Sequence, residues 1–314
     1  MPTRREFVQR GAAVGGALAA LGTVGSSAAC ASAGAAEQQA VSADASAGGA
    51  SHAGAHADGA IKQSVCKWCF NDMTVDALAA EAKRIGLRSV ELIDPPDFPD
   101  VVKHGLICAM TNAPGDPRTR IPKGFNRVEN HAWLVPLYKE HIAKVSAAGF
   151  PNLICFSGNR GGMGDDEGIE NCAKGLREII PAAEQAGVTI CMELLNSKVN
   201  HPDYQCDHTP WGVKLVEKVG SERFKLLYDI YHMQIMEGDV IHTIRDNHRH
   251  IAHYHTAGVP GRHEIDESQE LFYPAVMKAI ADTGYTGYVA QEFVPVKKEL
   301  GMVSLEDAYR RCAV

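Results

Sequence analysis

Short β-rich runs alternate with longer amphipathic stretches from residue 61 onward, and this alternation constrains the fold more than any other feature of the chain. Such alternation is typical of an α/β protein with a parallel sheet built from strand–helix units. Eight β-rich runs within about 250 residues favour a (β/α)8 TIM barrel over an open doubly wound sheet. The sequence contains no glycine-rich nucleotide-binding loop, which would have favoured the open sheet. The eight runs span residues 61–66, 88–93, 106–111, 152–156, 188–194, 224–229, 250–256 and 288–293. The amphipathic stretches span residues 74–85, 128–148, 167–186, 209–219, 240–247 and 270–283.

Glycines close several amphipathic stretches just before the next β-rich run, at Gly86, Gly149, Gly187 and Gly284. Glycine after the last turn of a helix readily takes the left-handed conformation that ends helices. These positions therefore mark the turns at the bottom of the barrel. Catalytic groups of such barrels lie at the opposite end, where the strands finish. The connection over residues 95–104 departs from this scheme because it is short and broken by prolines.

The first 60 residues differ in composition from the rest of the chain. Residues 1–30 hold an arginine pair at positions 4 and 5, followed by an uncharged run rich in Ala and Gly. This segment resembles a twin-arginine export signal, with a membrane anchor and lipidation of Cys30 as open alternatives. Residues 31–60 are almost wholly small and polar, which predicts a flexible linker before a catalytic barrel domain at 61–314. We therefore expect export by the twin-arginine machinery to a periplasmic or other extracytoplasmic location.

Charge and cysteine usage narrow the class of protein. The formal charge of -7 and the scattered Lys and Arg residues exclude a basic nucleic-acid surface, so we expect no nucleic-acid partner. Eight of the nine cysteines follow residues 1–30, and an even number in an exported protein invites disulfides. Several of them, however, sit in apolar β-rich runs, where a thiol acts as a small buried hydrophobe. Cys66 and Cys69 have redox or zinc spacing without a second pair, so we interpret them as structural.

Polar side chains end the last four β-rich runs, one in each run: Glu193, Asp229, His255 and Glu292. Because side chains alternate between the two faces of a strand, neighbouring apolar residues indicate that each of the four is the last inward position of its run. Three carboxylates and an imidazole in one barrel mouth would repel and raise one another's pKa unless a cation neutralised them. One divalent metal ion is the simplest such cation. Oxygen-rich ligands with one nitrogen suit Mn²⁺ or Mg²⁺, with Co²⁺ and Zn²⁺ as alternatives. Each residue alone could instead be a salt-bridged polar group at a strand end.

Five segments, taken in chain order, resemble a known family. They are Thr-Asn-Ala-Pro-Gly-Asp at 111–116, Glu-Leu-Leu-Asn at 193–196, Asp-Ile-Tyr-His-Met-Gln at 229–234, His-Tyr-His-Thr-Ala-Gly-Val-Pro-Gly-Arg-His-Glu at 253–264 and Gln-Glu-Phe at 291–293. Together they look like hydroxypyruvate isomerase and its relatives in the xylose-isomerase-like barrel superfamily, which includes the ketose 3-epimerases. The resemblance spans about residues 61–300, and the segment at 253–264 is its most specific part.

The resemblance implies roles for the four strand-end residues. It implies that Glu193, Asp229, His255 and Glu292 bind the metal ion and that the two glutamates also transfer protons. The chemistry suits these groups, since moving a hydrogen between adjacent carbons of a hydroxy-carbonyl compound passes through an enediolate. A metal ion chelates the oxygens of that species while a carboxylate carries the proton.

Three further side chains are candidate substrate ligands. By the same resemblance His232 and Arg262 contact substrate oxygens. His232 could instead be a partner of a metal ligand, and Arg262, which could clamp a carboxylate through two hydrogen bonds, could instead be a solvated loop arginine. Asn112 could bond a substrate hydroxyl or serve the turn beside it.

The leading hypothesis is therefore a metal-dependent aldose–ketose isomerase acting on a small hydroxy-carbonyl acid or carbohydrate. A ketose 3-epimerase, or a lyase acting on an oxidised 3-keto glycoside, is the alternative that export and the histidine at position 255 favour, because some hydroxypyruvate isomerases carry glutamine there. An apurinic endonuclease of the same superfamily would need more histidines and a basic groove. A non-catalytic exported sugar-binding protein would not require both Glu193 and Glu292.

Overall fold

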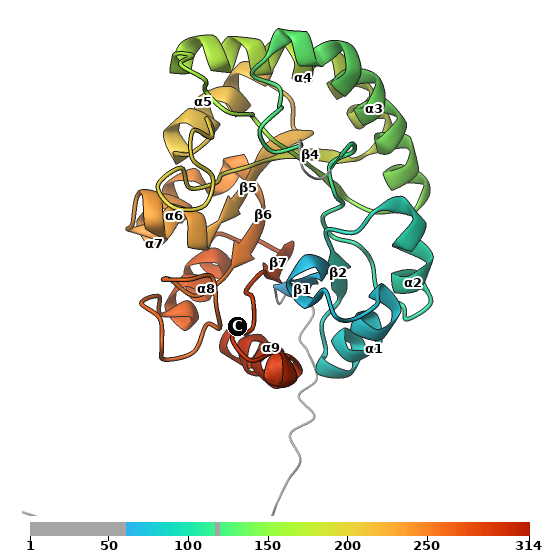
Figure 1. The fold of residues 1–314 in the computed structure, drawn as a ribbon, viewed down its shortest axis with the longest axis vertical. Coiled ribbons are helices and arrows are strands. Elements are labelled where there is room, and N and C mark those ends of the chain that lie inside the picture. Colours follow the sequence, from blue (N-terminus) through green and yellow to red (C-terminus); the bar gives the residue numbers. More distant parts are fainter. Residues whose placement is uncertain (1–60, 117–119) are drawn as a thin grey trace, which may run out of the picture. The chain divides into compact units, whose positions relative to one another are not determined.

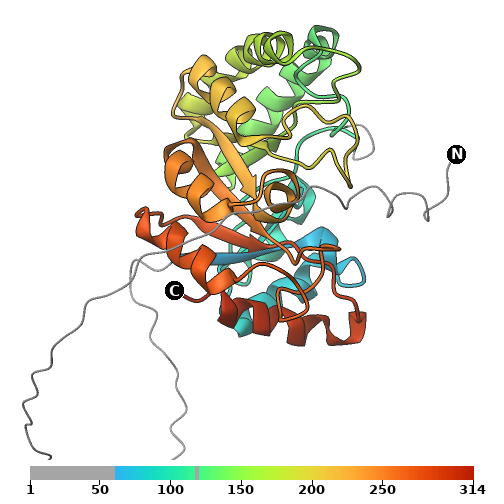
Figure 2. The ribbon, with the colours of Figure 1, turned by 90° about the vertical axis from the view of Figure 1, so that its left-hand side faces the viewer.

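The computed structural model describes residues 61–116 and 120–314. The predicted export signal, the linker and Cys30 lie outside the described residues. The described chain is built on one curled sheet of seven parallel strands in the order β2-β1-β7-β6-β5-β4-β3 (Figures 1 and 2). The strands are β1 (Lys62–Cys66), β2 (Ser89–Glu91), β3 (Asn152–Cys155), β4 (Thr189–Glu193), β5 (Phe224–Asp229), β6 (Ile251–Thr256) and β7 (Tyr288–Gln291).

Helices surround the strands, as Figure 1 shows. Six of them confirm the predicted amphipathic stretches, although the last of these begins at residue 273 rather than 270. Three helices were not predicted: a short one in the proline-broken connection after β2, a short one directly after β5 and one near the C-terminus. The helices are α1 (Val75–Ile85), α2 (Phe98–Val102), α3 (Val128–Ala147), α4 (Asp165–Ala186), α5 (Thr209–Val219), α6 (Ile230–Met236), α7 (Val240–Asn247), α8 (Tyr273–Asp282) and α9 (Gly301–Arg311). Every helix within the described residues is too short or too polar to cross a lipid bilayer.

The third of the eight predicted strands, over residues 106–111, is the one incorrect strand prediction. This segment makes only isolated parallel bridges, from Ile107 to Ser89 of β2 and from Thr111 to Leu153 of β3. It nevertheless lies between the two outer strands of the sheet and connects them. The described fold is thus a TIM-type barrel in which an irregular extended segment takes the place of one strand.

Side-chain hydrogen bonds explain why residues 106–111 form no regular strand. The backbone N–H of Ala109 donates to Oγ of Ser89 at 2.9 Å, and its carbonyl accepts from the amide of Asn152 at 2.8 Å. Both groups of a buried peptide are thereby satisfied without the ladder bonds of a strand. A run of apolar residues predicts burial correctly here, but it does not reveal that side chains replace the backbone partners.

Helix α1 shows how the outer layer packs on the barrel. Its buried residues Val75, Leu78, Ala79, Ala82 and Ile85 recur at spacings of three and four, so they form one apolar stripe. The stripe faces the strands, and complete burial of a side chain such as Leu78 contributes about 1.5–3 kcal/mol to folding. The same pattern in the other helices forms the layer between strands and helices.

The glycines at the bottom of the barrel have the predicted conformation. Gly86 follows α1 with φ 109° and Gly187 follows α4 with φ 70°, and each N–H closes the last helical turn. Gly149 and Gly284 also have positive φ. Because these turns precede strands, the opposite end of the barrel holds the carboxyl ends of the strands. This is the end at which the predicted polar residues meet.

Candidate active site

The four strand-end residues come together at the carboxyl ends of adjacent strands. Glu193 ends β4, Asp229 ends β5, His255 lies one residue before the end of β6, and Glu292 directly follows β7. All four are buried, and one ligand atom from each lies within 4.8 Å of the others. The convergence predicted from the sequence is therefore what the fold produces, whereas the functional roles of the residues stay predictions.

The parallel register explains this convergence. Asp229 is paired with His255 across β5 and β6, and His255 is paired with Ala290 across β6 and β7. Glu292 is two residues beyond Ala290 and therefore shares its face of the sheet. Glu193 is paired with Leu227, two residues before Asp229, which places the two acids on one face in the same way.

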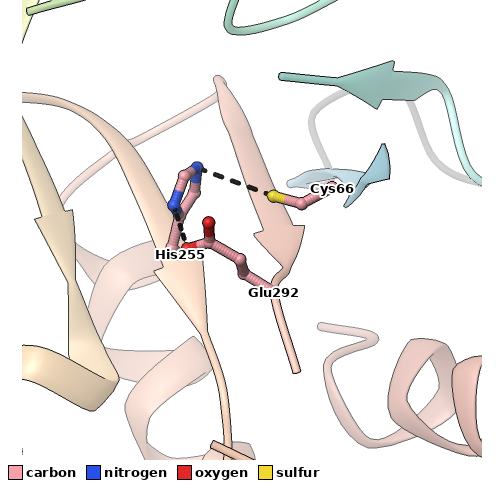
Figure 3. Close-up of side chains that lie close together, drawn as sticks. All are labelled: Cys66, His255 and Glu292. Atoms are coloured by element: carbon pink, nitrogen blue, oxygen red, sulfur yellow. Dashed lines mark hydrogen bonds and ion pairs between the residues drawn. The ribbon is translucent and has the colours of Figure 1, made fainter. Parts of the chain in front are cut away.

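The imidazole of His255 connects two groups of side chains. Its Nδ1 lies 2.6 Å from Oε2 of Glu292 and 3.8 Å from Oε1 of Glu193. Its Nε2 donates to Oε1 of Glu91 at 2.9 Å, because a carboxylate can only accept. Figure 3 shows the ring between Glu292 on one side and Cys66 on the other, with the Cys66 sulfur 4.0 Å from Nε2. The Nε2 bond to Glu91 leaves Nδ1 as the nitrogen directed at the carboxylates.

Arg262 lies inside the site and is not a solvated loop arginine, so that alternative is wrong. Its Nη2 lies 2.9 Å from Oδ2 of Asp229 and 2.5 Å from Oε2 of Glu292. The rings of Trp68 and Tyr231 flank the guanidinium, with centroids 5.4 and 5.0 Å away. Trp68 also donates its indole N–H to Glu292 at 2.6 Å. The loop after β6 thus places a rigidly held cation among the acids.

Burial and charge give the acids different protonation behaviour. Burial, followed by the negative charge of Glu292, raises the pKa of Glu193 well above its usual range. Burial also raises the pKa of Asp229 to about 6, although Arg262 opposes the rise. For Glu292 burial acts in the same direction, but Arg262 and His255 outweigh it and hold the pKa of this carboxyl well below its usual range. The pKa values of the two neighbouring glutamates are therefore shifted in opposite directions.

The residues present fit a divalent metal ion. Three buried carboxylates share one guanidinium and one imidazole, so a further cation would balance their charge. The donor set is three carboxylates and Nδ1 of one histidine, within the short separation that one ion requires. Glu193, Asp229, His255 and Glu292 are thus the residues that would hold the ion. The nature of these ligands favours a hard divalent ion such as Mn²⁺ or Mg²⁺.

His232 and Asn112 both reach the site from adjacent loops and helices. The ring of His232, in the first turn of α6, is fully buried, with Nε2 2.5 Å from Nη1 of Arg262 and 3.6 Å from Oδ2 of Asp229. It both lines the cavity and touches a proposed metal ligand, so the two interpretations of His232 are compatible. The amide of Asn112 lines the cavity and donates to the carbonyl of Leu92 at 3.0 Å.

A cavity of about 470 Å³ opens above these residues. Its polar lining includes Glu193, His232, Arg262 and Glu292, and its apolar lining includes Ile154 and Phe156. Trp68 stands at its edge. A concave site that combines apolar walls with a few converging polar groups is typical of binding sites for small molecules.

Sequence reasoning missed the groups behind His255. Glu91, at the end of β2, is fully buried and its Oε1 accepts from Nε2 of both His253 and His255, at 2.8 and 2.9 Å. These imidazoles hold the pKa of Glu91 at about 2 despite its burial. Glu91 lies within the predicted run 88–93, but its partners are 162 and 164 positions away, so the pattern of that run does not reveal them. All eight described cysteines are free and buried. The ligand atoms of Cys66, His255 and Glu292 lie within 4.8 Å of one another, so the structural interpretation of Cys66 stays a prediction.

The fold and the cluster define a barrel enzyme of the sugar isomerase and epimerase type. Residues 79–302 match the family described as Xylose isomerase-like TIM barrel, and the chain belongs to this family. A human protein named as a hydroxypyruvate isomerase is 26% identical over 222 residues, which cover 71% of this chain and 76% of the relative. The 2-oxo-tetronate isomerase of Haemophilus influenzae is 27% identical over 239 residues, 72% of this chain and 90% of the relative. Among solved structures, a protein of Brucella melitensis titled AP endonuclease, family 2, aligns with a TM-score of 0.69 and 25% identity, over 79% of this chain and 99% of that chain.

Proposed function

We propose that this protein is a metal-dependent isomerase that interconverts aldose and ketose forms of a small hydroxy-carbonyl acid, of which hydroxypyruvate is the simplest. The observation that carries the proposal is the arrangement of Glu193 and Glu292, which approach the same ring nitrogen of His255 from different strands, with Arg262 beside them. Two carboxylates and one guanidinium in a small cavity suit a substrate that exchanges protons and carries negative charge. The names of the relatives point to the same class of reaction.

Proton transfer is assigned to the two glutamates. One carboxylate takes a proton from the carbon next to the carbonyl, and the electron pair of the broken C–H bond forms the enediolate. The other gives a proton to the former carbonyl carbon while the hydroxyl proton moves to the former carbonyl oxygen, so the substrate is isomerised without net gain or loss of hydrogen. Proton exchange with solvent then restores both carboxyl groups. The opposite pKa shifts of Glu193 and Glu292 are those expected for an acid and a base that work as a pair.

The other residues bind and orient the substrate. A divalent ion in this site supplies Lewis-acid polarisation of the carbonyl. Arg262 offers its guanidinium to a substrate carboxylate, and the ring of His232 lies beside it for a neighbouring oxygen. The apolar side chains of Ile154 and Phe156 also line the cavity and would limit the access of water to the reacting carbons.

The test is turnover of hydroxypyruvate by the purified chain loaded with Mn²⁺ or Mg²⁺, in H₂O and in D₂O. The proposal predicts tartronate semialdehyde as product and deuterium at the carbon next to the carbonyl. Glu193→Gln and Glu292→Gln should each lower turnover by about 10²-fold or more while retaining an oxygen ligand. Glu222→Gln is the matched control, because this exposed glutamate lies two residues before β5, at the end of the strand opposite Asp229. Normal turnover and exchange in either site variant would overturn the assignment.

A larger substrate is the second candidate. The cavity of about 470 Å³ is larger than a three-carbon acid requires. A ketose 3-epimerase, or a lyase acting on a 3-keto glycoside, would use the same glutamates. Parallel assays with free ketoses and 3-keto glycosides separate these activities from the isomerase. Binding of any of them without turnover or exchange would indicate a sugar-binding protein.

Export by the twin-arginine route is part of the proposal and is supported by residues 1–30 alone. The expected result is accumulation in the periplasmic fraction. Replacement of the arginines at positions 4 and 5 by lysine should retain the protein in the cytoplasm. Equal periplasmic amounts of both forms would contradict this route.

A further inference from the structure

Two arginines line the cavity at the carboxyl end of the barrel, and they come from opposite sides of its mouth. Arg262 lies on the loop after β6. Arg120 follows the extended segment 106–111, which bridges β2 and β3. Counted round the barrel from this segment, β6 is the fourth strand in either direction. The loops that carry the two arginines therefore face each other across the cavity.

The charges of these two arginines are balanced differently. Nη2 of Arg262 forms ion pairs with Asp229 and Glu292, at 2.9 and 2.5 Å. Arg120 is partly buried, and its Nη1 donates to the carbonyl of Ala113 at 2.9 Å. No carboxylate in the part of the chain that the structure describes forms an ion pair with Arg120. Of the two arginines in the cavity, Arg120 is thus the one whose charge no described acid balances.

The surroundings of Arg120 suit a bound anion. Its backbone N–H donates to the carbonyl of Asp116 at 3.1 Å, and with the bond to Ala113 this ties the residue to its own loop. The apolar side chains of Ile121 and Ile154 line the same cavity. A guanidinium offers parallel N–H groups to a carboxylate, and this interaction is stronger where apolar neighbours reduce the amount of water. One guanidinium matches the single charge of a carboxylate, whereas a phosphate monoester carries about two charges.

We propose that Arg120 is a specificity-determining residue that binds a carboxylate at the end of the substrate remote from the reacting carbons. Resting on the proposed isomerase function, this names the substrate class as hydroxy-carbonyl acids long enough to reach from Glu193 and Glu292 to Arg120. The cavity of about 470 Å³ has room for such a chain. A neutral ketose lacks the carboxylate and leaves the charge of Arg120 unbalanced, so Arg120 selects acids over neutral sugars.

The test measures binding rather than turnover, with gluconate and glucitol as probes. Gluconate carries a carboxylate where glucitol carries a neutral hydroxymethyl group, and neither has an aldehyde or ketone group that could be isomerised. Titration calorimetry with the full-length, metal-loaded protein should show tighter binding of gluconate than of glucitol, and Arg120→Gln should lower this preference by about 10- to 100-fold. Arg120→Lys keeps the charge without the parallel donors and should lower it less. Arg245→Gln makes the same change at an exposed arginine of α7 and should leave the preference as in the wild type.

Several outcomes overturn the proposal. An unchanged preference in folded Arg120→Gln would refute it, and so would an equal loss of affinity for both probes, because a merely structural role in the loop affects acid and alditol alike. If Arg120→Gln does not fold, the wild type still decides, since equal affinity for gluconate and glucitol would refute the proposal. A larger Arg120-dependent preference for glucitol 6-phosphate would refute the assignment of a carboxylate. Neither gluconate nor glucitol is turned over, so these measurements separate failure of this inference from failure of the proposed function.

Discussion

Replacement of Glu91 tests whether a residue across the barrel supports the proposed metal ligand His255. Oε1 of Glu91 accepts the Nε2–H of both His253 and His255, and all three side chains are fully buried. Glu91→Gln retains an accepting oxygen but removes the charge. Glu91→Leu removes the acceptor and leaves two buried N–H groups without a partner.

The magnitudes follow from these two bonds. A bond to a charged acceptor contributes about 1 kcal/mol more than a neutral one, so Glu91→Gln should lose about 2 kcal/mol in total. Each unpaired buried donor costs about 1–3 kcal/mol, so Glu91→Leu should lose about 2–6 kcal/mol. At about 2–4 °C per kcal/mol for a domain of this size, Tm should fall by about 4–8 °C in Glu91→Gln and further in Glu91→Leu.

Metal affinity provides the second measurement. Groups that orient a ligating histidine typically change metal affinity by about 10–100-fold when they are replaced. Titration calorimetry with Mn²⁺ should therefore show weaker binding in both Glu91 variants and unchanged binding in the exposed control Glu222→Gln. Wild-type affinity in both Glu91 variants, or a Glu91→Leu variant as stable as Glu91→Gln, would refute the reasoning.

Three other predictions concern stability and reactivity. A chain that begins at Ile61 should melt within about 1 °C of the full chain, because residues 1–60 hold too few large apolar side chains to form a core. A larger fall in Tm would contradict this prediction. Burial raises the pKa of the Cys66 thiol and of its buried counterparts, so native Cys30→Ser protein should react with no thiol reagent within minutes, and denatured protein should expose eight thiols. Burial lowers the pKa of His141 in the folded chain, so as the pH falls this imidazole binds a proton in the unfolded chain before it does in the folded chain. The free energy of unfolding therefore falls as the pH drops below about 6.5. The Tm loss between pH 7.5 and 5.5 should be smaller in His141→Gln, and an equal loss would count against this assignment.

The local pattern of apolar and polar residues was sufficient to predict most of the strands and helices. Seven of the eight predicted strands form, because strands and amphipathic helices are encoded by residues a few positions apart. The exception, residues 106–111, depends on Ser89 and Asn152, whose side chains take over the backbone bonds of Ala109. Helix α6 was missed since it is a short helix that directly follows a strand without a polar linker.

The sequence by itself determined that Glu193, Asp229, His255 and Glu292 would meet, because each ends its run at an inward position and parallel strands finish at one end of a barrel. Only the tertiary structure decided what surrounds them. Closure of the barrel brings Glu91 against His255, 164 positions away. The orientations of side chains such as Arg262 and Asn196 depend on hydrogen-bond partners from other elements, and no periodicity along one strand or helix specifies those partners.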